Sequence, residues 1–209
     1  MGYRKTFLCC TLALAAWPAQ ARPVAYPDGW MVMGMHDYIR DTATVMYSPT
    51  AKDAVGIRTD FMRDREEWFH TATYNRLLKR WNTADSQANI FALSGAGVAQ
   101  HGDRSNAAAL LGMEADWETR RLYTAYENMW MYAGPVSRSY WQRGRVGVAP
   151  YAGGYKDVNT WLMLQVDHRP AEKHNVVVTP MVRLFTHQVL GELGISHTGK
   201  VMVNITTQF

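Results

Sequence analysis

Ten charged residues occur in short segments where apolar and polar side chains alternate. Side chains at every second position of a β-strand share one face, so these charges are predicted to lie opposite the apolar residues. Five bases and five acids on one face can pair in a dry interior, or they can line a water-filled passage for small polar solutes or ions. Both interpretations stay open. The ten residues are Arg58, Asp60, Glu114, Asp116, Arg121, Glu127, Arg143, Arg145, Arg183 and Glu192.

A second group with ligand chemistry consists of Met31, Met33, Met35 and His36. Thioether and imidazole donors suit the soft ion Cu(I), so one hypothesis is a copper site formed by these four residues. The alternative is the ordinary apolar packing of alternate methionines in a strand. Methionine is frequent in this chain, with 12 in 209 residues, and this favours the packing interpretation. We expect no other cofactor.

Six residues are of the types that serve as nucleophile, base and orienting group in serine hydrolases and acyltransferases. They are His36, Asp37, His70, Ser94, Ser196 and His197. Ser196 and His197 are adjacent in a predicted strand, where neighbouring side chains point to opposite faces. They are therefore poorly placed to bond to each other, and we assign no catalytic residues.

Twelve segments of alternating character are separated by turn residues such as Gly, Pro, Asn and Asp, and they predict an all-β chain. No long amphipathic helix and no internal repeat is visible. Pro180 lies inside one segment and lacks a backbone donor, so it predicts a β-bulge there. The segments are 31–37, 42–48, 54–62, 68–81, 88–98, 107–117, 121–132, 141–151, 158–168, 176–185, 189–196 and 200–209.

The last segment has the clearest alternation, with Val201, Val203 and Ile205 on the same face as the terminal Phe209. A closing strand of this kind with a terminal aromatic residue resembles that of bacterial outer-membrane β-barrels. The resemblance implies a transmembrane antiparallel up-and-down β-barrel of about 12 strands, with Phe209 as part of the signal read by the barrel-insertion machinery. An even strand count places both termini on the periplasmic side, with the longer connections expected at the opposite end.

Residues 1–21 have the features of a secretory signal peptide. Two basic residues precede an apolar run over residues 7–17, and Ala19-Gln20-Ala21 is a small-x-small cleavage pattern. We therefore expect a signal peptide over residues 1–21, cleaved after export through the inner membrane, and an outer-membrane β-barrel domain over residues 22–209.

The predicted cleavage changes the composition of the chain. Cys9 and Cys10 are the only cysteines, so the processed chain has no thiol for a disulfide or a metal. Without Arg4 and Lys5, the remaining basic residues nearly balance the 18 acidic ones, and we expect no nucleic-acid partner. An aromatic content of 12% is favourable at membrane interfaces.

Together these observations predict a non-enzymatic protein of the outer membrane of a Gram-negative bacterium. It is either a narrow pore for small solutes or ions, or a closed structural barrel with a salt-bridged interior. The expected partners are outer-membrane lipids, the insertion machinery and small polar solutes or ions; the sequence does not indicate an oligomeric state. A lipid-modifying enzyme and a copper-handling membrane protein remain as alternatives, and alternation alone also fits a soluble periplasmic β-sandwich.

Overall fold

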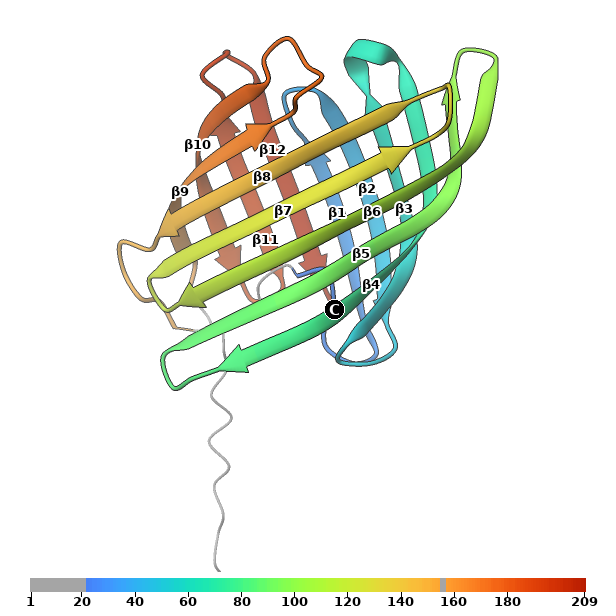
Figure 1. The fold of residues 1–209 in the computed structure, drawn as a ribbon. Helices are drawn as coiled ribbons and strands as arrows, with labels where there is room; N and C mark the ends of the chain where they lie inside the picture. The colour runs from blue at the N-terminus through green and yellow to red at the C-terminus, as the bar shows by residue number, and fades with distance from the viewer. Residues whose placement is uncertain (1–21, 155–156) are drawn as a thin grey trace, which may run out of the picture.

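The computed structural model describes residues 22–154 and 157–209, and its twelve strands close into one antiparallel barrel (Figure 1). Each strand pairs with its neighbours in the chain, and β1 pairs with β12. The predicted barrel is confirmed, and the β-sandwich alternative is wrong because the sheet closes on itself. The strands are β1 Gly29–His36, β2 Arg40–Ser48, β3 Asp53–Met62, β4 Glu67–Asn82, β5 Ser86–His101, β6 Arg104–Thr119, β7 Leu122–Tyr132, β8 Arg138–Val148, β9 Asn159–His168, β10 Val176–Thr186, β11 Val189–Ile195 and β12 Val201–Gln208.

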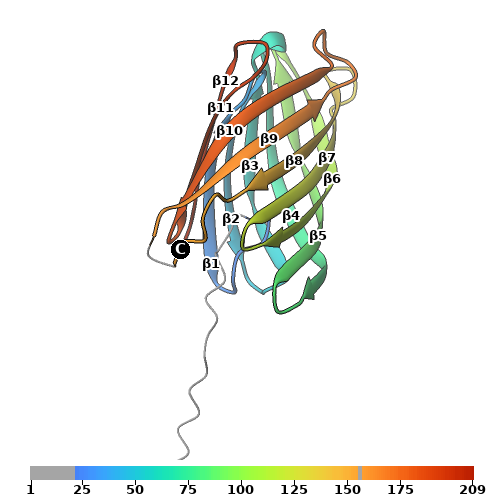
Figure 2. The same ribbon diagram turned by 90° about the vertical axis from the view of Figure 1, so that its left-hand side faces the viewer.

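The strands run obliquely across the barrel wall (Figures 1 and 2), as closure of a sheet requires. A single 3₁₀ turn, η1 (Arg63–Arg65), interrupts the described strands and turns. The described part of the chain contains no helix with the length and hydropathy of a membrane span. The predicted signal peptide, residues 1–21, lies outside the described residues.

The two faces of each strand differ in polarity, as the alternation predicts. On β3, Ile57 is 65% exposed on the outer surface while Asp60 is 0% exposed inside the barrel. The large residues exposed on the barrel wall are mostly Val, Leu, Ile, Trp and Tyr. Because a basic residue facing lipid at mid-depth costs about 2–4 kcal/mol, this outer surface is compatible with hydrocarbon and the charges belong inside.

The β-bulge prediction at Pro180 is wrong. The register of β9 and β10 continues through Pro180 opposite Leu164 without a shift. On its other side, the pairing of β10 with β11 ends at Met181, so Pro180 needs no donor there. The register shift lies instead between Leu77 and Lys79, where β4 pairs with β5.

The barrel has a terminal end, where Arg22 and Phe209 lie, and an opposite end. Connections at the opposite end span residues 37–39, 63–66, 102–103, 133–137, 169–175 and 196–200, and those at the terminal end span 49–52, 83–85, 120–121, 149–158 and 187–188. The expectation that all longer connections lie at the opposite end is wrong, because residues 149–158 form the longest link. A turn of two residues is enough to join two antiparallel strands. Longer connections are therefore possible at either end of the barrel.

Candidate functional site

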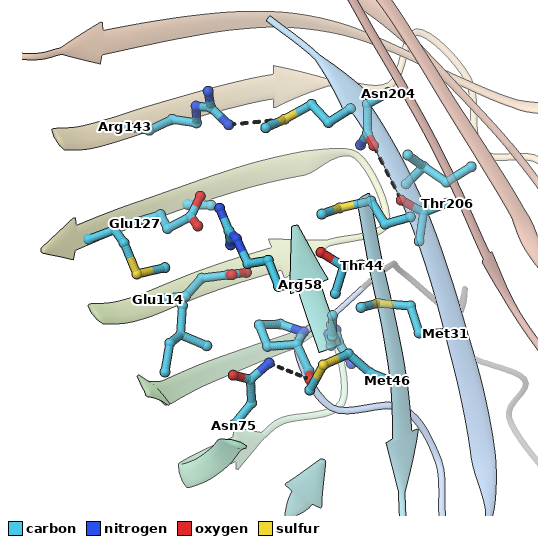
Figure 3. A pocket seen from close by; sticks show the side chains of 18 of the residues that line it. Met31, Thr44, Met46, Arg58, Asn75, Glu114, Glu127, Arg143, Asn204 and Thr206 are labelled. Atoms are coloured by element: carbon cyan, nitrogen blue, oxygen red, sulfur yellow. Dashed lines mark hydrogen bonds between the residues drawn. The ribbon is translucent and has the colours of Figure 1, made fainter. Parts of the chain in front are cut away.

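A cavity of about 140 Å³ lies inside the barrel (Figure 3). Nine charged residues line it, six arginines and three glutamates: Arg22, Arg40, Arg58, Arg143, Arg145, Arg183, Glu114, Glu127 and Glu192. Seven of the ten charges selected from the sequence are in this set. Asp60 and Asp116 are buried inside the barrel without lining the cavity.

Arg121 does not join the others. It lies in the turn between β6 and β7, is exposed, and donates to the backbone carbonyl oxygens of Ala149 and Pro150. The predicted strand begins at Arg121, whereas β7 begins at Leu122. The placement of Arg121 in the interior is therefore wrong, and its side chain instead ties two turns together at the terminal end.

An ion-pair cluster closes the barrel interior at the opposite end. We call Asp37, Arg40, Arg143, Asp167 and Arg169 the Asp37 cluster. Arg143 Nη2 and Arg169 Nη2 donate to Asp37 Oδ2 at 3.2 and 3.3 Å, and Arg40 Nη2 lies 3.6 Å from the same oxygen. Arg143 Nε also donates to Asp167 Oδ1 at 2.7 Å. All five side chains are almost completely buried, so the cluster excludes water from this end.

Asp37 occupies the turn that joins β1 and β2, and its two oxygens have separate partners. Oδ1 accepts the backbone N–H groups of Ile39 and Arg40 at 3.0 and 2.8 Å, while Oδ2 accepts the guanidinium groups. Burial alone would raise the pKa of Asp37, but Arg169, Arg40 and Arg143 outweigh it and hold that pKa well below its usual range. The carboxylate is therefore charged at neutral pH.

Trp141 on β8 is the centre around which the arginines pack. The guanidinium carbons of Arg40, Arg143 and Arg169 lie 4.7, 5.4 and 5.5 Å from its ring centroid. Cations within about 6 Å of an indole face are attracted by its quadrupole, most strongly when they are desolvated. This ring partly offsets the cost of burying three like charges together.

Ion pairs also occupy the middle of the barrel. Arg58 Nε donates to Asp60 Oδ2 at 2.7 Å, and Arg183 Nε donates to Glu192 Oε1 at 2.8 Å. Glu114 and Glu127 behave differently, because they stand directly opposite each other on β6 and β7 and make no ion pair or hydrogen bond to a described residue. They give the cavity wall a locally negative region.

The segment 22–28 covers the terminal end of the cavity. Arg22 donates to Glu118, and the carbonyl oxygen of Pro23 accepts from Asn75 Nδ2 at 3.1 Å. Val24 is 3% exposed and packs in the apolar part of the interior. The chain thus enters the barrel before β1 begins, and the cavity lies between this segment and the Asp37 cluster.

The predicted metal set of Met31, Met33, Met35 and His36 is not assembled. The three methionines line the cavity, but His36 lies on the other face of β1, where its Nδ1 is 2.6 Å from Asp41 Oδ1. Adjacent strand residues point to opposite faces, so His36 cannot join the methionines. Among residues 22–154 and 157–209, no group of three or more His, Cys, Asp or Glu residues could hold a metal ion.

The residues considered for hydrolase chemistry do not meet either. His197 Nδ1 accepts the backbone N–H of Val178 at 3.1 Å, while Ser196 Oγ lies 2.8 Å from Thr198 Oγ1. Ser94 donates to a backbone carbonyl oxygen, and His70 is 3.1 Å from a threonine hydroxyl on the outer surface. No nucleophile and base from this set are paired within the described residues.

Sequence reasoning missed most of the Asp37 cluster. It selects Asp37 only as a hydrolase candidate, and it does not select Arg40, Asp167 or Arg169. Asp167 and Gln165 lie two residues apart on β9 and both point inward. The alternation along this strand could therefore have identified Asp167. Arg169 lies in a turn, where alternation gives no information.

A closed antiparallel barrel with an apolar outer surface and a charged interior defines the class of transmembrane β-barrels. No protein-family model matches the sequence, and the comparison with curated proteins returns no match. The solved structure titled "KdgM porin in complex with disordered oligogalacturonate" is similar with a TM-score of 0.51 and 7% identity, covering 87% of this chain and 98% of that one. This likeness concerns the fold alone.

Two further solved structures are similar at lower scores. "KdgM porin" has a TM-score of 0.49 and 9% identity, covering 87% of this chain and 98% of that one. The Acinetobacter baumannii outer membrane protein Omp33 has a TM-score of 0.41 and 10% identity, covering 86% of this chain and 96% of that one.

Proposed function

We propose that the chain is a non-enzymatic, narrow pore of the outer membrane, closed in the described conformation at both ends. The observation that carries this proposal is the charged cavity between the Asp37 cluster and the segment 22–28. Ligand pockets for drug-sized molecules measure roughly 300–1,000 Å³, so a cavity of about 140 Å³ holds only water or small ions. Passage of a solute requires one of the two closures to move.

The energetics of buried ion pairs favour a pore over a purely structural barrel. Replacing buried ion pairs by well-packed apolar side chains is often neutral or stabilising by about 1–4 kcal/mol. A barrel that needed only to be filled would gain nothing from charges such as Arg58 and Glu127 at the cavity wall. Barrels of eight strands are just filled by side chains, and twelve strands enclose more room.

The environment follows from the outer surface and the termini. We place the exposed apolar rows in outer-membrane lipid, with the terminal end on the periplasmic side, as in other barrels of even strand number. Phe209 at that end would be available to the insertion machinery during assembly. The signal peptide over residues 1–21 would direct export, and the segment 22–28 would then be the start of the processed chain.

The solute is proposed to be small and acidic. Six arginines against three glutamates line the cavity, and guanidinium groups bind carboxylates through paired hydrogen bonds. The similar structure whose title names oligogalacturonate, an acidic oligosaccharide, also supports an acidic solute. The segment 22–28 is the better candidate for the moving closure, because its described ion pairing is that of Arg22 with Glu118, whereas the Asp37 cluster joins three arginines to two aspartates and is almost completely buried.

Planar-bilayer recording tests this proposal. We expect refolded protein comprising residues 22–209 to conduct weakly, and a chain lacking residues 22–28 to conduct several times more, with a reversal potential that favours anions. Arg22→Gln, which removes the pair with Glu118, is a milder variant that should raise the frequency of openings. Heat-modifiable migration in gel electrophoresis verifies folding. If folded wild-type and truncated barrels are both silent at every salt concentration, the chain is a closed structural barrel.

A further inference from the structure

Methionine is distributed unevenly between the two sides of the barrel wall. Of the eleven methionines in the described residues, nine are buried in the interior, Met33 lines the cavity, and only Met113 is exposed on the outer surface. The outer surface carries Val, Leu and Ile instead. Since methionine and leucine are both apolar and similar in size, burial alone does not explain why methionine is placed inside.

Three of these methionines form a triangle on one patch of the cavity wall. Met31 on β1 stands directly opposite Met46 on β2, and Met33 is the next inward residue on β1. Cβ atoms of opposed residues lie about 4.5–5.5 Å apart and diagonal ones about 7–8 Å. A methionine side chain has three rotatable bonds, so three sulfur atoms at this spacing can converge on one ion.

The three methionines line the cavity, and the sulfur of Met46 contacts a polar group there. Thr73 Oγ1 donates to Met46 Sδ at 3.1 Å, so this sulfur faces the interior, and a metal ion would use its second lone pair or displace the hydroxyl. Figure 3 shows Met31 and Met46 beside one another at the cavity wall. Met35 differs, because Arg143 Nη1 lies 3.5 Å from its sulfur and a guanidinium there repels a metal cation. The triangle therefore excludes Met35.

Although arginines outnumber glutamates around the cavity as a whole, Glu114 and Glu127 form a local region of its wall that can accept one cation. The arginines at its wall are held by carboxylates, for example Arg58 by Asp60 and Arg183 by Glu192. Glu114 and Glu127 line the same cavity and have no ion-pair partner among the described residues. A monovalent cation in the cavity would also be attracted to this pair of opposed glutamates.

We propose that Met31, Met33 and Met46 form a binding site for a soft monovalent metal ion, Cu(I) or Ag(I), inside the barrel. Thioether sulfur selects such ions over Mg²⁺, Ca²⁺ and Mn²⁺, which prefer oxygen ligands. This site differs from the one predicted from the sequence. His36 and Met35 are not part of it, and Met46, which stands opposite Met31 in the pairing of β1 with β2, takes their place. Binding requires no solute passage, so the site does not depend on the proposed pore function.

Metal titration of refolded protein in detergent tests the site. Ag(I), and Cu(I) kept reduced by ascorbate in competition with a chromophoric chelator, are expected to bind with one ion per barrel. Met31→Leu and Met46→Leu should each weaken binding by about tenfold or more, as loss of a ligand or its support typically does. X-ray absorption at the copper edge should show sulfur neighbours without imidazole scattering.

Matched variants separate binding at the methionine triangle from binding of the metal elsewhere on the barrel. Met113→Leu on the outer surface and His36→Ala on the outer face of β1 should leave the affinity unchanged, and Zn(II) should not compete. Leucine preserves apolar packing, so each variant is expected to show the heat-modifiable migration of a folded barrel. The proposal is overturned if wild-type protein binds no Ag(I), if a folded triple Met→Leu variant at positions 31, 33 and 46 binds equally well, or if His36→Ala abolishes binding.

Discussion

Trp30 and Phe209 close the barrel by exchanging both of their backbone hydrogen bonds. Trp30 N donates to Phe209 O at 2.7 Å, and Phe209 N donates to Trp30 O at 3.0 Å. The last residue of the chain is thereby paired with the second residue of β1, although Phe209 itself lies beyond the end of β12. The seam between β1 and β12 thus extends to Phe209.

This pairing permits a test that separates stability from assembly. Phe209→Ala keeps both backbone hydrogen bonds and removes only the exposed ring, so the free energy of unfolding of refolded protein should change by less than about 1 kcal/mol. If the ring is read by the insertion machinery, the same variant should strongly reduce the amount of folded barrel in outer-membrane fractions of cells. Phe209→Tyr should restore it. Equal amounts of wild type and Phe209→Ala in the outer membrane would exclude the role of Phe209 as an insertion signal.

Asp37→Asn should destabilise the barrel strongly. The substitution leaves Arg40, Arg143 and Arg169 without their shared carboxylate, and breaking a buried ion pair on one side costs about 3–5 kcal/mol. Asp41→Asn is the control, since Asp41 is 42% exposed and pairs with Arg63 near the surface. Such exposed pairs contribute about 0–1 kcal/mol. Urea unfolding in lipid vesicles, followed by tryptophan fluorescence, measures both; similar losses for the two variants would contradict the importance of the cluster.

Stability should also depend on pH through Asp37. Its pKa is lower in the folded protein than in the unfolded chain, where an aspartate has a pKa of about 4. The contribution of the charged carboxylate is therefore present in full above the unfolded pKa and is lost as pH falls through the folded pKa. The difference in unfolding free energy between wild type and Asp37→Asn should be constant from about pH 6 to 8 and should shrink below about pH 4. If the difference instead grows as the pH falls, folding raises the pKa of Asp37 and does not lower it.

Two strand glycines, Gly97 on the inner face of β5 and Gly144 on the outer face of β8, should respond differently to alanine. A Cβ atom at Gly97 would lie 1.9 Å from the backbone oxygen of His70 on β4, whereas a Cβ at Gly144 would meet nothing within 4 Å. Gly97→Ala must displace backbone and should cost about 1–3 kcal/mol, as overpacking does. Gly144→Ala should be neutral or stabilising by about 0.4–1 kcal/mol. Thermal unfolding of both variants measures these two changes in stability. Equal effects would mean that β4 and β5 do not approach as closely at Gly97 as described.

The contact between lipid and the barrel wall is tested at Ile57. This residue is 65% exposed on the outer surface, so Ile57→Lys should lower stability in lipid vesicles by about 2–4 kcal/mol if it lies near the bilayer midplane. Ile57→Val keeps an apolar side chain and serves as the control. If the Ile57→Lys protein is as stable in vesicles as the wild type, Ile57 does not face lipid.

The alternation of residues along each strand made the barrel wall predictable. Ile57 and Arg58 are neighbours, yet one faces outward and the other lines the cavity, because the period of a strand is two and needs no information from distant residues. Parity alone did not place Met31, Met33 and Met35, because these side chains are apolar and yet line the cavity. It failed at Arg121 and at Arg169, since both lie in turns where side-chain direction has no fixed period.

The sequence by itself determined the fold class, the approximate strand limits and the inward direction of most of the charged strand residues it selected, since these depend on local alternation and turn chemistry. Only the tertiary structure decided which inward side chains meet. Asp37 pairs with Arg143 and Arg169, more than a hundred residues away along the chain, and Met31 stands opposite Met46 rather than beside His36. Such contacts depend on the register of each strand pair and on the tilt at which the sheet closes, and these are properties of the whole barrel.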